Sequence, residues 1–144
     1  MSWVNILVHL VFSTKNREPF LNSSKFRELT FRHIRNYCKL KQIHLLSVGG
    51  YSDHIHCLIS LGRDQNISEI SRLIKGESAF WINNNFSLKQ RFLWQDDYWA
   101  ESIHEGQMNK LKKYISLQEE HHKTHSFTDE ENELIKFHIS IPSA

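Results

Sequence analysis

Two apolar runs on either side of a pair of glycines constrain the fold of this chain more than any other feature. Residues 43–48 and 54–61 are short and apolar, and Gly49 and Gly50 lie in the stretch that joins them. Apolar runs of this length, separated by a glycine-containing turn, predict the two antiparallel strands of a β-hairpin. The chain is therefore expected to contain an antiparallel sheet.

The other apolar segments alternate between strand and helix patterns around this hairpin. A continuous apolar run indicates a strand, apolar residues at helical spacing indicate helices, and Asn66 with Glu69 resembles a capping box. The expected elements are a strand over 3–12, a helix over 23–39, the hairpin, a helix from 67 to about 83–85, a strand over 99–103 and a helix over 105–122. This order predicts an α+β fold, a ferredoxin-like split βαβ antiparallel sheet with an added C-terminal helix.

Length and composition predict one domain. The chain has 144 residues, of which 40% are hydrophobic and 12% aromatic, enough to form a core. We expect a single domain over 1–144, with its core over 3–127 and a short C-terminal helix or tail over 128–144. No run approaches the roughly 18 apolar residues of a membrane span, and the N-terminus lacks a signal-peptide pattern. These features predict a cytoplasmic protein with no membrane partner.

Three residues inside predicted elements are expected to be buried for structural reasons. Cys38 and Cys57 form neither a disulfide framework nor a CxxC metal site, so they are predicted to be reduced thiols. His9 lies in the first apolar strand and is expected to be a core histidine whose ring nitrogens have hydrogen-bond partners.

Four polar residues would form one site if the last predicted helix packs on the hairpin. His54 and His56 lie two apart on a strand, and Tyr114 and Gln118 lie four apart on a helix, so each pair shares a face. Two imidazoles and an amide oxygen can bind a divalent metal, and a nearby tyrosine could attack a group that this metal polarises. The His-apolar-His pattern alone is a weak signal, and Tyr114 alone is typical of a core aromatic.

The sequence around these four residues resembles a known family. Phe12 to Arg17, Asp53 to His56, Trp94 with Gln95, and Tyr114 to His122 follow the order of the single-tyrosine HUH transposases of bacterial insertion sequences. HUH denotes His, hydrophobic, His, and the family includes the repeat-associated tyrosine transposases. The segment from Tyr114 is the most specific part of the resemblance.

The resemblance implies a reaction and an assembly. His54, His56 and Gln118 would bind a divalent metal, Mg²⁺ or Mn²⁺, and Tyr114 would be the catalytic nucleophile. The implied substrates are single-stranded DNA hairpins at element ends, which are cut and rejoined through a 5′-phosphotyrosine link and a free 3′-hydroxyl. Members of the family work as homodimers in which the tyrosine helix of one subunit can complete the site of the other.

Four further residues near these motifs are candidates to support the site. Lys110 lies one helical turn before the tyrosine, and we expect it to lower the phenol pKa or to hold a phosphate. Asp53 can hydrogen-bond a histidine, or can simply terminate the turn before it. His121 and His122 can approach the site, or can cap the end of the helix.

The distribution of charge suggests a nucleic-acid partner. Residues 1–95 carry 13 Lys and Arg against 6 Asp and Glu, whereas residues 96–144 carry 5 against 10. Basic side chains after the first strand and on the first helix are expected to contact phosphates. The residues proposed for DNA binding are Lys15, Arg17, Arg32 and Arg35. A solvated helix face is the alternative explanation for each of them taken singly.

Two other functions remain open. A metal-dependent nuclease or phosphohydrolase would cut without a covalent intermediate, and a non-catalytic ferredoxin-like module would bind nucleic acid without cutting it. The aromatic RNP signature of RNA-binding domains is not evident. Histidine-triad hydrolases have a third alternating histidine, and position 58 is Leu58. One segment departs from the family pattern: Asp96 to Glu101 is acidic and lacks the glycine expected there.

Overall fold

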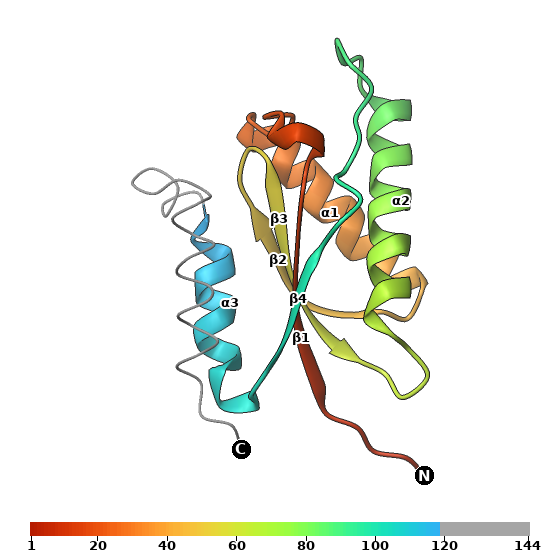
Figure 1. The fold of residues 1–144 in the computed structure, drawn as a ribbon, viewed down its shortest axis with the longest axis vertical. Helices are drawn as coiled ribbons and strands as arrows, with labels where there is room; N and C mark the ends of the chain where they lie inside the picture. Colours follow the sequence, from red (N-terminus) through yellow and green to blue (C-terminus); the bar gives the residue numbers. More distant parts are fainter. Residues whose placement is uncertain (119–144) are drawn as a thin grey trace.

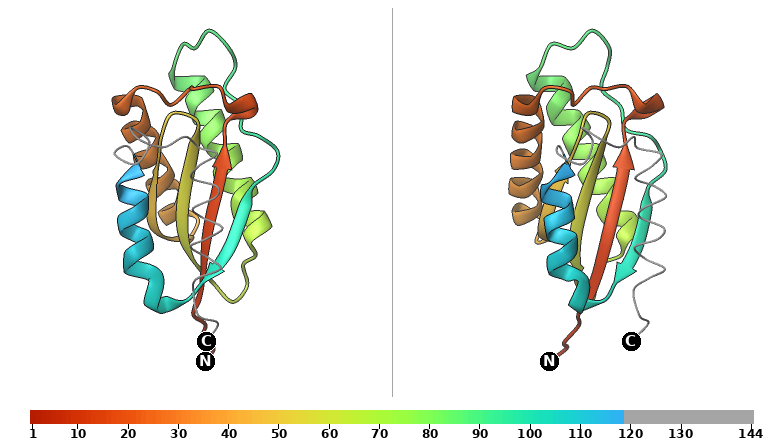
Figure 2. Two further views of the ribbon diagram at one scale, coloured as in Figure 1. Left: turned by 60° about the vertical axis from the view of Figure 1, so that its left-hand side comes forward. Right: turned by 90° about the vertical axis from the view of Figure 1, so that its left-hand side faces the viewer.

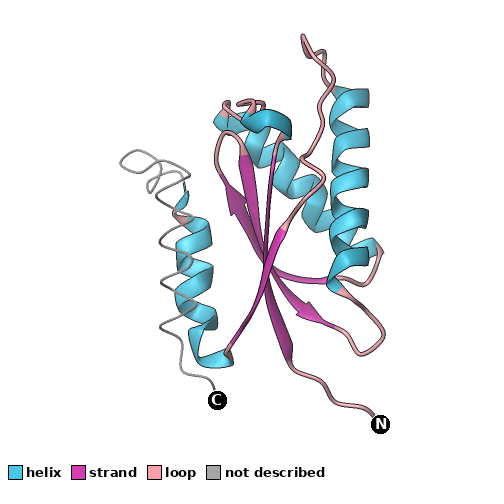
Figure 3. Cartoon of the chain, in the orientation of Figure 1, coloured by secondary structure: helices cyan, strands magenta, loops and turns pink. Residues whose placement is uncertain are grey.

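The computed structural model describes residues 1–118, which form a four-stranded antiparallel sheet with helices on both faces (Figures 1 and 3). The strands are β1 (Ile6–Ser13), β2 (His44–Gly50), β3 (His54–Leu61) and β4 (Trp99–Ile103), and the helices are α1 (Ser24–Leu40), α2 (Ile67–Asn85) and α3 (Met108–Ser116). The strand order is β2-β3-β1-β4, and all neighbours are antiparallel. This topology confirms the predicted α+β fold with its added helix.

The sheet separates two layers of different composition. Helices α1 and α2 cover one face and α3 packs on the other, as the turned views in Figure 2 show. Because successive side chains of a strand point to opposite faces, Ile55 and Cys57 of β3 join the core under α1 and α2. Leu58 instead joins a smaller cluster with Leu111 and Ile115 of α3.

Both long helices begin with a side-chain cap, of which the one at Asn66 was predicted. The Ser23 hydroxyl accepts a hydrogen bond from the backbone N–H of Phe26, and Asn66 Oδ1 accepts one from the backbone N–H of Glu69 at 2.9 Å. Such caps satisfy N–H groups that have no partner within the helix. The Glu69 carboxylate does not complete a capping box; it pairs with Arg72 on the next turn.

The two glycines of the hairpin do not form its turn, so that part of the sequence prediction is wrong. Gly49 and Gly50 are the last residues of β2, where they pair with His56 and Ile55, and residues 51–53 form the turn. A Cβ at Gly49 would lie only 2.4 Å from the carbonyl oxygen of Ile115. Gly49 is therefore required by the close approach of α3 to the sheet.

Helix α3 and strand β1 begin later than predicted. A 3₁₀ turn over Glu105–Gln107 precedes α3, which spans Met108–Ser116, and residues 119–122 of the predicted helix lie outside the described residues. The N–H of Leu117 is shared between the carbonyls of Lys113 and Tyr114 at 3.1 and 3.3 Å, a bifurcated pattern frequent at helix ends. Strand β1 begins at Ile6, and Trp3 before it is exposed. The predicted tail over 128–144 lies outside the described residues.

The two cysteines are buried and free. Both belong to the core under α1 and α2, where burial raises the pKa of the Cys38 thiol to about 11 and also raises that of Cys57. The thiols are thus protonated near neutral pH, which agrees with the predicted structural role. Within residues 1–118, no helix is both long enough and apolar enough to cross a membrane.

Candidate active site

The four residues expected to form a site come together between β3 and α3. His54 and His56 are fully buried on the face of β3 that α3 covers. His54 Nε2 lies 3.3 Å from Gln118 Oε1, and the ring centroids of His56 and Tyr114 are 5.7 Å apart in an edge-to-face arrangement. Packing of the last helix on the hairpin, which the sequence argument assumed, is thus a feature of the structure.

A small apolar cluster holds α3 in this position. Leu111 and Ile115 lie four residues apart and pack on Leu7, Leu58 and Ile103 of the sheet. Each of these five side chains is at most 8% exposed. Residues four apart share a helix face, so this contact also turns Tyr114 and Gln118 toward β3 and its edge. Together with Gly49, the cluster determines how near the tyrosine comes to the histidines.

His54 is held by the residue that precedes it. Its Nδ1 lies 2.8 Å from Asp53 Oδ1, and the carboxylate is an acceptor, so the ring donates through Nδ1. In the neutral ring the proton is then on Nδ1 and the lone pair is on Nε2. This is the carboxylate–histidine arrangement common beside metal-binding imidazoles.

The orientation of Gln118 allows a test of whether the site suits a cation. Its Nε2 donates to the carbonyl of Tyr114 at 3.2 Å, which directs Oε1 toward Nε2 of His54. Two lone pairs 3.3 Å apart repel each other. Either His54 is doubly protonated and donates to both oxygens, or a cation lies between the two acceptors. An imidazole nitrogen beside an amide oxygen is a donor set that fits a divalent metal.

His56 is held by a second histidine, which sequence reasoning assigned only to the core. His9 of β1 is fully buried, and its Nε2 lies 2.9 Å from Nδ1 of His56. The edge of Trp99 packs against the His9 ring at a centroid distance of 5.2 Å. The contact follows from the register of β1 and β3, where Val11 pairs with His56 and His9 pairs with Leu58. The sequence indicates which face of the strand His9 occupies, but it does not indicate how β1 is aligned with β3.

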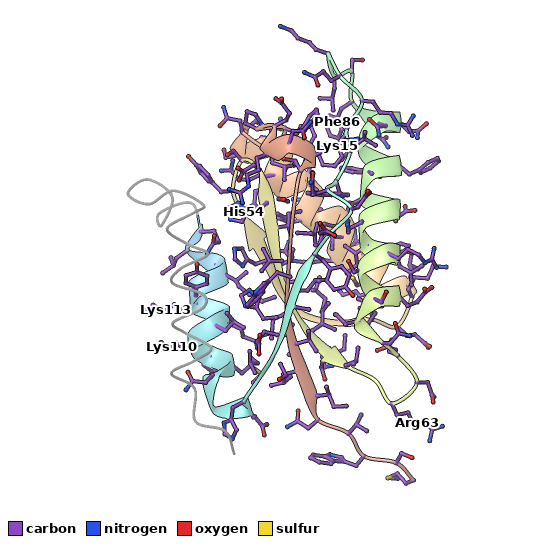
Figure 4. All side chains as sticks on the ribbon, viewed as in Figure 1. Lys15, His54, Arg63, Phe86, Lys110 and Lys113 are labelled. Atoms are coloured by element: carbon purple, nitrogen blue, oxygen red, sulfur yellow. The ribbon has the colours of Figure 1, made fainter. Side chains whose placement is uncertain are left out.

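The other proposed supporting residues are less closely placed. Lys110 is exposed one turn before Tyr114, and it projects with Lys113 from the side of α3 away from the sheet (Figure 4). His121 and His122 lie outside the described residues. Within the described residues no group of three or more His, Cys, Asp and Glu side chains is arranged to hold a metal, so the candidate set depends on its glutamine.

The proposed DNA-binding residues fall into two groups. Lys15 and Arg17 are exposed in the 3₁₀ turn Lys15–Arg17 after β1, and Figure 4 shows Lys15 toward the same end of the sheet as His54. Arg35 of α1 lines a cavity of about 220 Å³ that also reaches Gln118, whereas Arg32 is exposed and does not line it. Of these residues, Arg35 therefore lies nearest to the candidate active site, through the cavity that it shares with Gln118.

The segment that lacks the expected glycine still forms regular structure. Its start is fixed by Gln95, whose N–H donates to the carbonyl of Ser13 at 2.8 Å, and by a bridge between Trp94 and Thr14. No residue from 96 to 101 has a positive φ, so none of them requires glycine for its backbone conformation. The departure from the family pattern does not disturb β4.

Comparisons with known proteins identify related transposases. The family described as "Transposase IS200 like" matches residues 2–118. The transposases for insertion sequence element IS200 of Salmonella typhimurium and Salmonella typhi are each 25% identical over 124 residues, covering 83% of this chain and 80% of the relative. Both comparisons span the strand with the two histidines and the helix with the tyrosine.

Two solved structures share the fold. A candidate transposase from Deinococcus radiodurans superposes with a TM-score of 0.66 at 22% identity, over 82% of this chain and 95% of that chain. A REP-associated tyrosine transposase bound to a REP hairpin superposes with a TM-score of 0.62 at 19% identity, over 85% of this chain and 72% of the other.

Proposed function

The chain belongs to the IS200-like transposase family, and we propose that it cuts and rejoins single-stranded DNA at hairpin-bearing element ends through Tyr114. One observation carries this proposal: the tyrosine packs against His56 at the point where Gln118 meets His54. A nucleophile, two imidazoles and an amide oxygen are then in reach of one phosphate. A domain that only bound DNA would not require these buried polar groups to converge.

The cutting step proposed for Tyr114 is a transfer of the strand to the enzyme. The phenol oxygen forms a bond to phosphorus, and the bond from phosphorus to the 3′ oxygen breaks. The phenol loses its proton and the leaving 3′ oxygen gains one, so the products are a 5′-phosphotyrosine and a free 3′-hydroxyl. No water or nucleotide is consumed, and attack by another 3′-hydroxyl reverses the step to join new ends.

His54, His56 and Gln118 are the residues proposed to hold a divalent ion, Mg²⁺ or Mn²⁺. Such an ion supplies charge neutralisation at the phosphate and favours loss of the phenol proton. The chain's own contribution is orientation. Asp53 keeps the lone pair of His54 at Nε2, while His9 occupies Nδ1 of His56 and directs Nε2 of that ring into the site.

Lys110 is proposed to assist Tyr114 from the preceding turn of α3. A phenol with a pKa of about 10 is mostly protonated near neutral pH, and a nearby ammonium favours its ionised form. Changing Lys110 to Ala should lower the cleavage rate and move the rising part of its pH profile, where the phenol ionises, to higher pH. Lys113→Ala, an exposed lysine on the same helix, serves as the matched control. Equal pH profiles for the two variants would exclude this role.

We also propose that the active form is a homodimer. In the described chain Tyr114 lies against its own His56, so each subunit can carry a complete site. Mixing Tyr114→Phe with His56→Ala protein tests this arrangement, because recovered activity in the mixture requires a tyrosine that serves the partner's histidines. We expect no recovery. Size measurement by sedimentation gives the assembly state independently.

A covalent adduct is the direct product to look for. Hairpin oligonucleotides from the flanks of the gene, labelled at either end, are incubated with the protein and Mn²⁺ and separated under denaturing conditions. We expect the 3′-end label, which lies on the fragment whose new 5′ phosphate is bonded to the tyrosine, to remain with the protein, and to be lost with Tyr114→Phe. Cleavage without an adduct would favour a metal-dependent hydrolase, and binding without cleavage would favour a binding module.

A further inference from the structure

A cavity on the α2 side of the molecule is separate from the four residues of the candidate active site. It lies between one face of α2 and the segment that leads from Trp94 to Tyr98, and has a volume of about 390 Å³. Figure 1 shows this segment returning beside α2 before it enters β4. The volume falls within the range of about 300–1,000 Å³ typical of small-molecule sites.

One wall of the cavity contains a glycine that the helix itself does not need. Gly76 lies in the middle of α2, where glycine is destabilising relative to alanine. A Cβ built on Gly76 would meet no atom within 4 Å, so close packing does not require glycine there. What the missing side chain preserves is space inside the cavity. Residues that break a local rule without a structural reason often mark functional sites.

A second wall residue has an unused hydrogen-bonding group. Ser71 and Ser78 are both 1% exposed on α2. The Ser78 hydroxyl donates to the carbonyl of Ile74 at 2.6 Å and accepts from Trp94 Nε1 at 2.9 Å. Ser71 lines the cavity, and its buried hydroxyl has no hydrogen-bond partner among residues 1–118. Since buried polar groups are nearly always bonded, Ser71 is suited to contact a ligand.

Both basic side chains at the cavity already have hydrogen-bond partners. Arg72 pairs with Glu69 through its Nε at 3.0 Å, and Lys75 donates to the carbonyls of Asp96 and Asp97 at 2.9 and 3.4 Å. These bonds engage both basic side chains, so free phosphate is not the favoured ligand of the cavity. The remaining polar groups are two serine hydroxyls, the Gln95 amide and the Asp96 carboxylate, and with two aromatic rings they suit a flat, uncharged ligand part with polar edges.

The cavity is joined to the candidate active site by the backbone. Gln95 pairs with Ser13, and Ser13 pairs with His54 in the β1–β3 ladder. Two strand separations of about 4.8 Å place the backbone of Gln95 roughly 10 Å from that of His54. The cavity lies on the α2 side of the sheet and His54 and Tyr114 face α3, so a DNA strand held at the site reaches the cavity by passing the edge of the sheet beside Gln95.

We propose that this cavity receives one unpaired base of the single strand that is held at the candidate active site. The base would stack on Tyr98 and pass over Gly76, and its polar edge would bond to Ser71. This inference rests on the proposed function, because it takes the ligand to be single-stranded DNA. It adds a contact that reads or clamps one nucleotide away from the cleaved bond.

Binding by oligonucleotides with single missing bases tests the proposal. The probe is a fluorescent hairpin from the flanks of the gene with its single-stranded extension, and a set of copies each has one abasic position in that extension. With full-length protein, we expect one position at which the missing base weakens binding by about 5- to 100-fold. The same scan with Tyr114→Phe protein should give the same profile, because it measures binding without chemistry.

Variants of the cavity must change this profile in a specific way. Gly76→Leu fills the space, so the intact probe should bind as weakly as the abasic copy and the sensitive position should disappear. Gly76→Ala is the matched control; it should keep the profile and raise Tm by about 2–6 °C. Phe80→Ala changes an exposed residue of α2 outside the cavity and should have no effect. If Gly76→Leu does not fold, Ser71→Ala and Tyr98→Ala provide the same comparison.

Three results would overturn the inference. A flat abasic profile, or a sensitive position that persists in every folded cavity variant, would show that the cavity holds no base. Binding of free mononucleotides as tight as binding of the probe would indicate a separate nucleotide site.

A sensitive position that responds to Gly76→Leu while no adduct forms would support the cavity and count against the covalent mechanism, so the failure of the inference and the failure of the proposed function are distinguishable.

Discussion

The two faces of the sheet differ in the polarity of the side chains that they bury. Under α1 and α2 the buried side chains of β3 are Ile55, Cys57 and Ile59, part of a large apolar core. On the other face the same strand presents His54 and His56, and the apolar cluster under α3 is small. Alternation along one strand thus separates the residues that stabilise the fold from those assigned to chemistry.

The difference has a physical cost that explains how the polar face is built. A buried polar group without a hydrogen-bond partner destabilises a fold by about 1–3 kcal/mol according to mutational data. Each histidine of β3 accordingly has a defined contact, His54 with Asp53 and Gln118 and His56 with His9. The face assigned to chemistry is therefore specified by hydrogen bonds, and its helix is located by a few apolar side chains and Gly49.

Loss of a proposed metal ligand should have the largest effect on activity. His56→Ala is expected to lower metal-dependent cleavage by about 100- to 1,000-fold, because charge at the phosphate is no longer neutralised. Chelation of the metal should give a loss of similar size in the unchanged protein. Calorimetric Mn²⁺ titration and cleavage rates are the measurements. His44 is an exposed histidine at the start of β2, and His44→Ala should leave Mn²⁺ binding and the cleavage rate unchanged. Equal losses in the His44 and His56 variants would contradict the role of His56 as a metal ligand.

Displacement of α3 should come next. Gly49→Ala places a Cβ against the Ile115 carbonyl, which must move because the unshifted distance would be 2.4 Å. A shift of about 1 Å in a catalytic group can reduce the rate about 100-fold. Cleavage should fall by about this factor while the far-UV circular dichroism spectrum stays the same. Gly106→Ala is a suitable comparison, since the nearest contact there is a flexible His104 side chain at 3.1 Å. Unchanged cleavage by Gly49→Ala would contradict the role of helix position.

Removing the carboxylate behind His54 should have an intermediate effect. Asp53→Asn is expected to weaken Mn²⁺ binding by about 10- to 100-fold, because the amide no longer orients the ring or increases its basicity. Asp64→Asn, an exposed carboxylate beyond the end of β3, should bind the metal normally. Binding by Asp53→Asn that matches the unchanged protein would mean that this residue only terminates the turn.

A substitution on the opposite face should affect stability and not the reaction. Ile59 is fully buried under α1 and α2, and Ile59→Ala is expected to lower the free energy of unfolding by about 2–5 kcal/mol. Cleavage per folded molecule should be retained at a temperature where the variant is folded. Denaturant titration gives the stability. A loss of cleavage as large as that of Gly49→Ala would contradict the conclusion that the face under α1 and α2 affects only stability.

The smallest expected effect concerns the pH dependence of the apolar face. An unfolded thiol has a pKa of about 8.5, and burial raises that of Cys38 to about 11. The folded state therefore favours the protonated form, and this contribution is fully present below about pH 8.5 and is lost as the pH rises through about 11. Cys38→Ala should flatten the decline in Tm between these pH values. An identical decline in both proteins would show that other groups cause it.

Local patterns predicted most of the fold, whereas contacts between distant segments were not accessible. The strand over 99–103 and the cap at Asn66 were correct because they depend on neighbouring residues. Gly49 was misplaced because a glycine that allows a helix to approach looks like a turn glycine in the sequence. Phe80 fits the apolar pattern of the helix but is 65% exposed. Ser78 is polar but buried, and its hydroxyl accepts a hydrogen bond from Trp94, a contact that the local pattern does not indicate.

The candidate site shows the same limit. The parity of His54 and His56 on a strand, and of Tyr114 and Gln118 on a helix, was sufficient to predict that each pair shares a face. The bond between His9 and His56 depends on the register of β1 against β3, which no local pattern contains. The cavity at Gly76 likewise depends on how the segment after α2 returns along it.

Peptide mapping of the covalent adduct tests the central claim most directly. The chain contains four tyrosines, Tyr37, Tyr51, Tyr98 and Tyr114, so the modified one can be identified by mass spectrometry after digestion of protein and DNA. The account predicts a nucleotide remnant attached through its 5′ phosphate to Tyr114 alone. A remnant on any other tyrosine, or cleavage with no modified tyrosine, would contradict it.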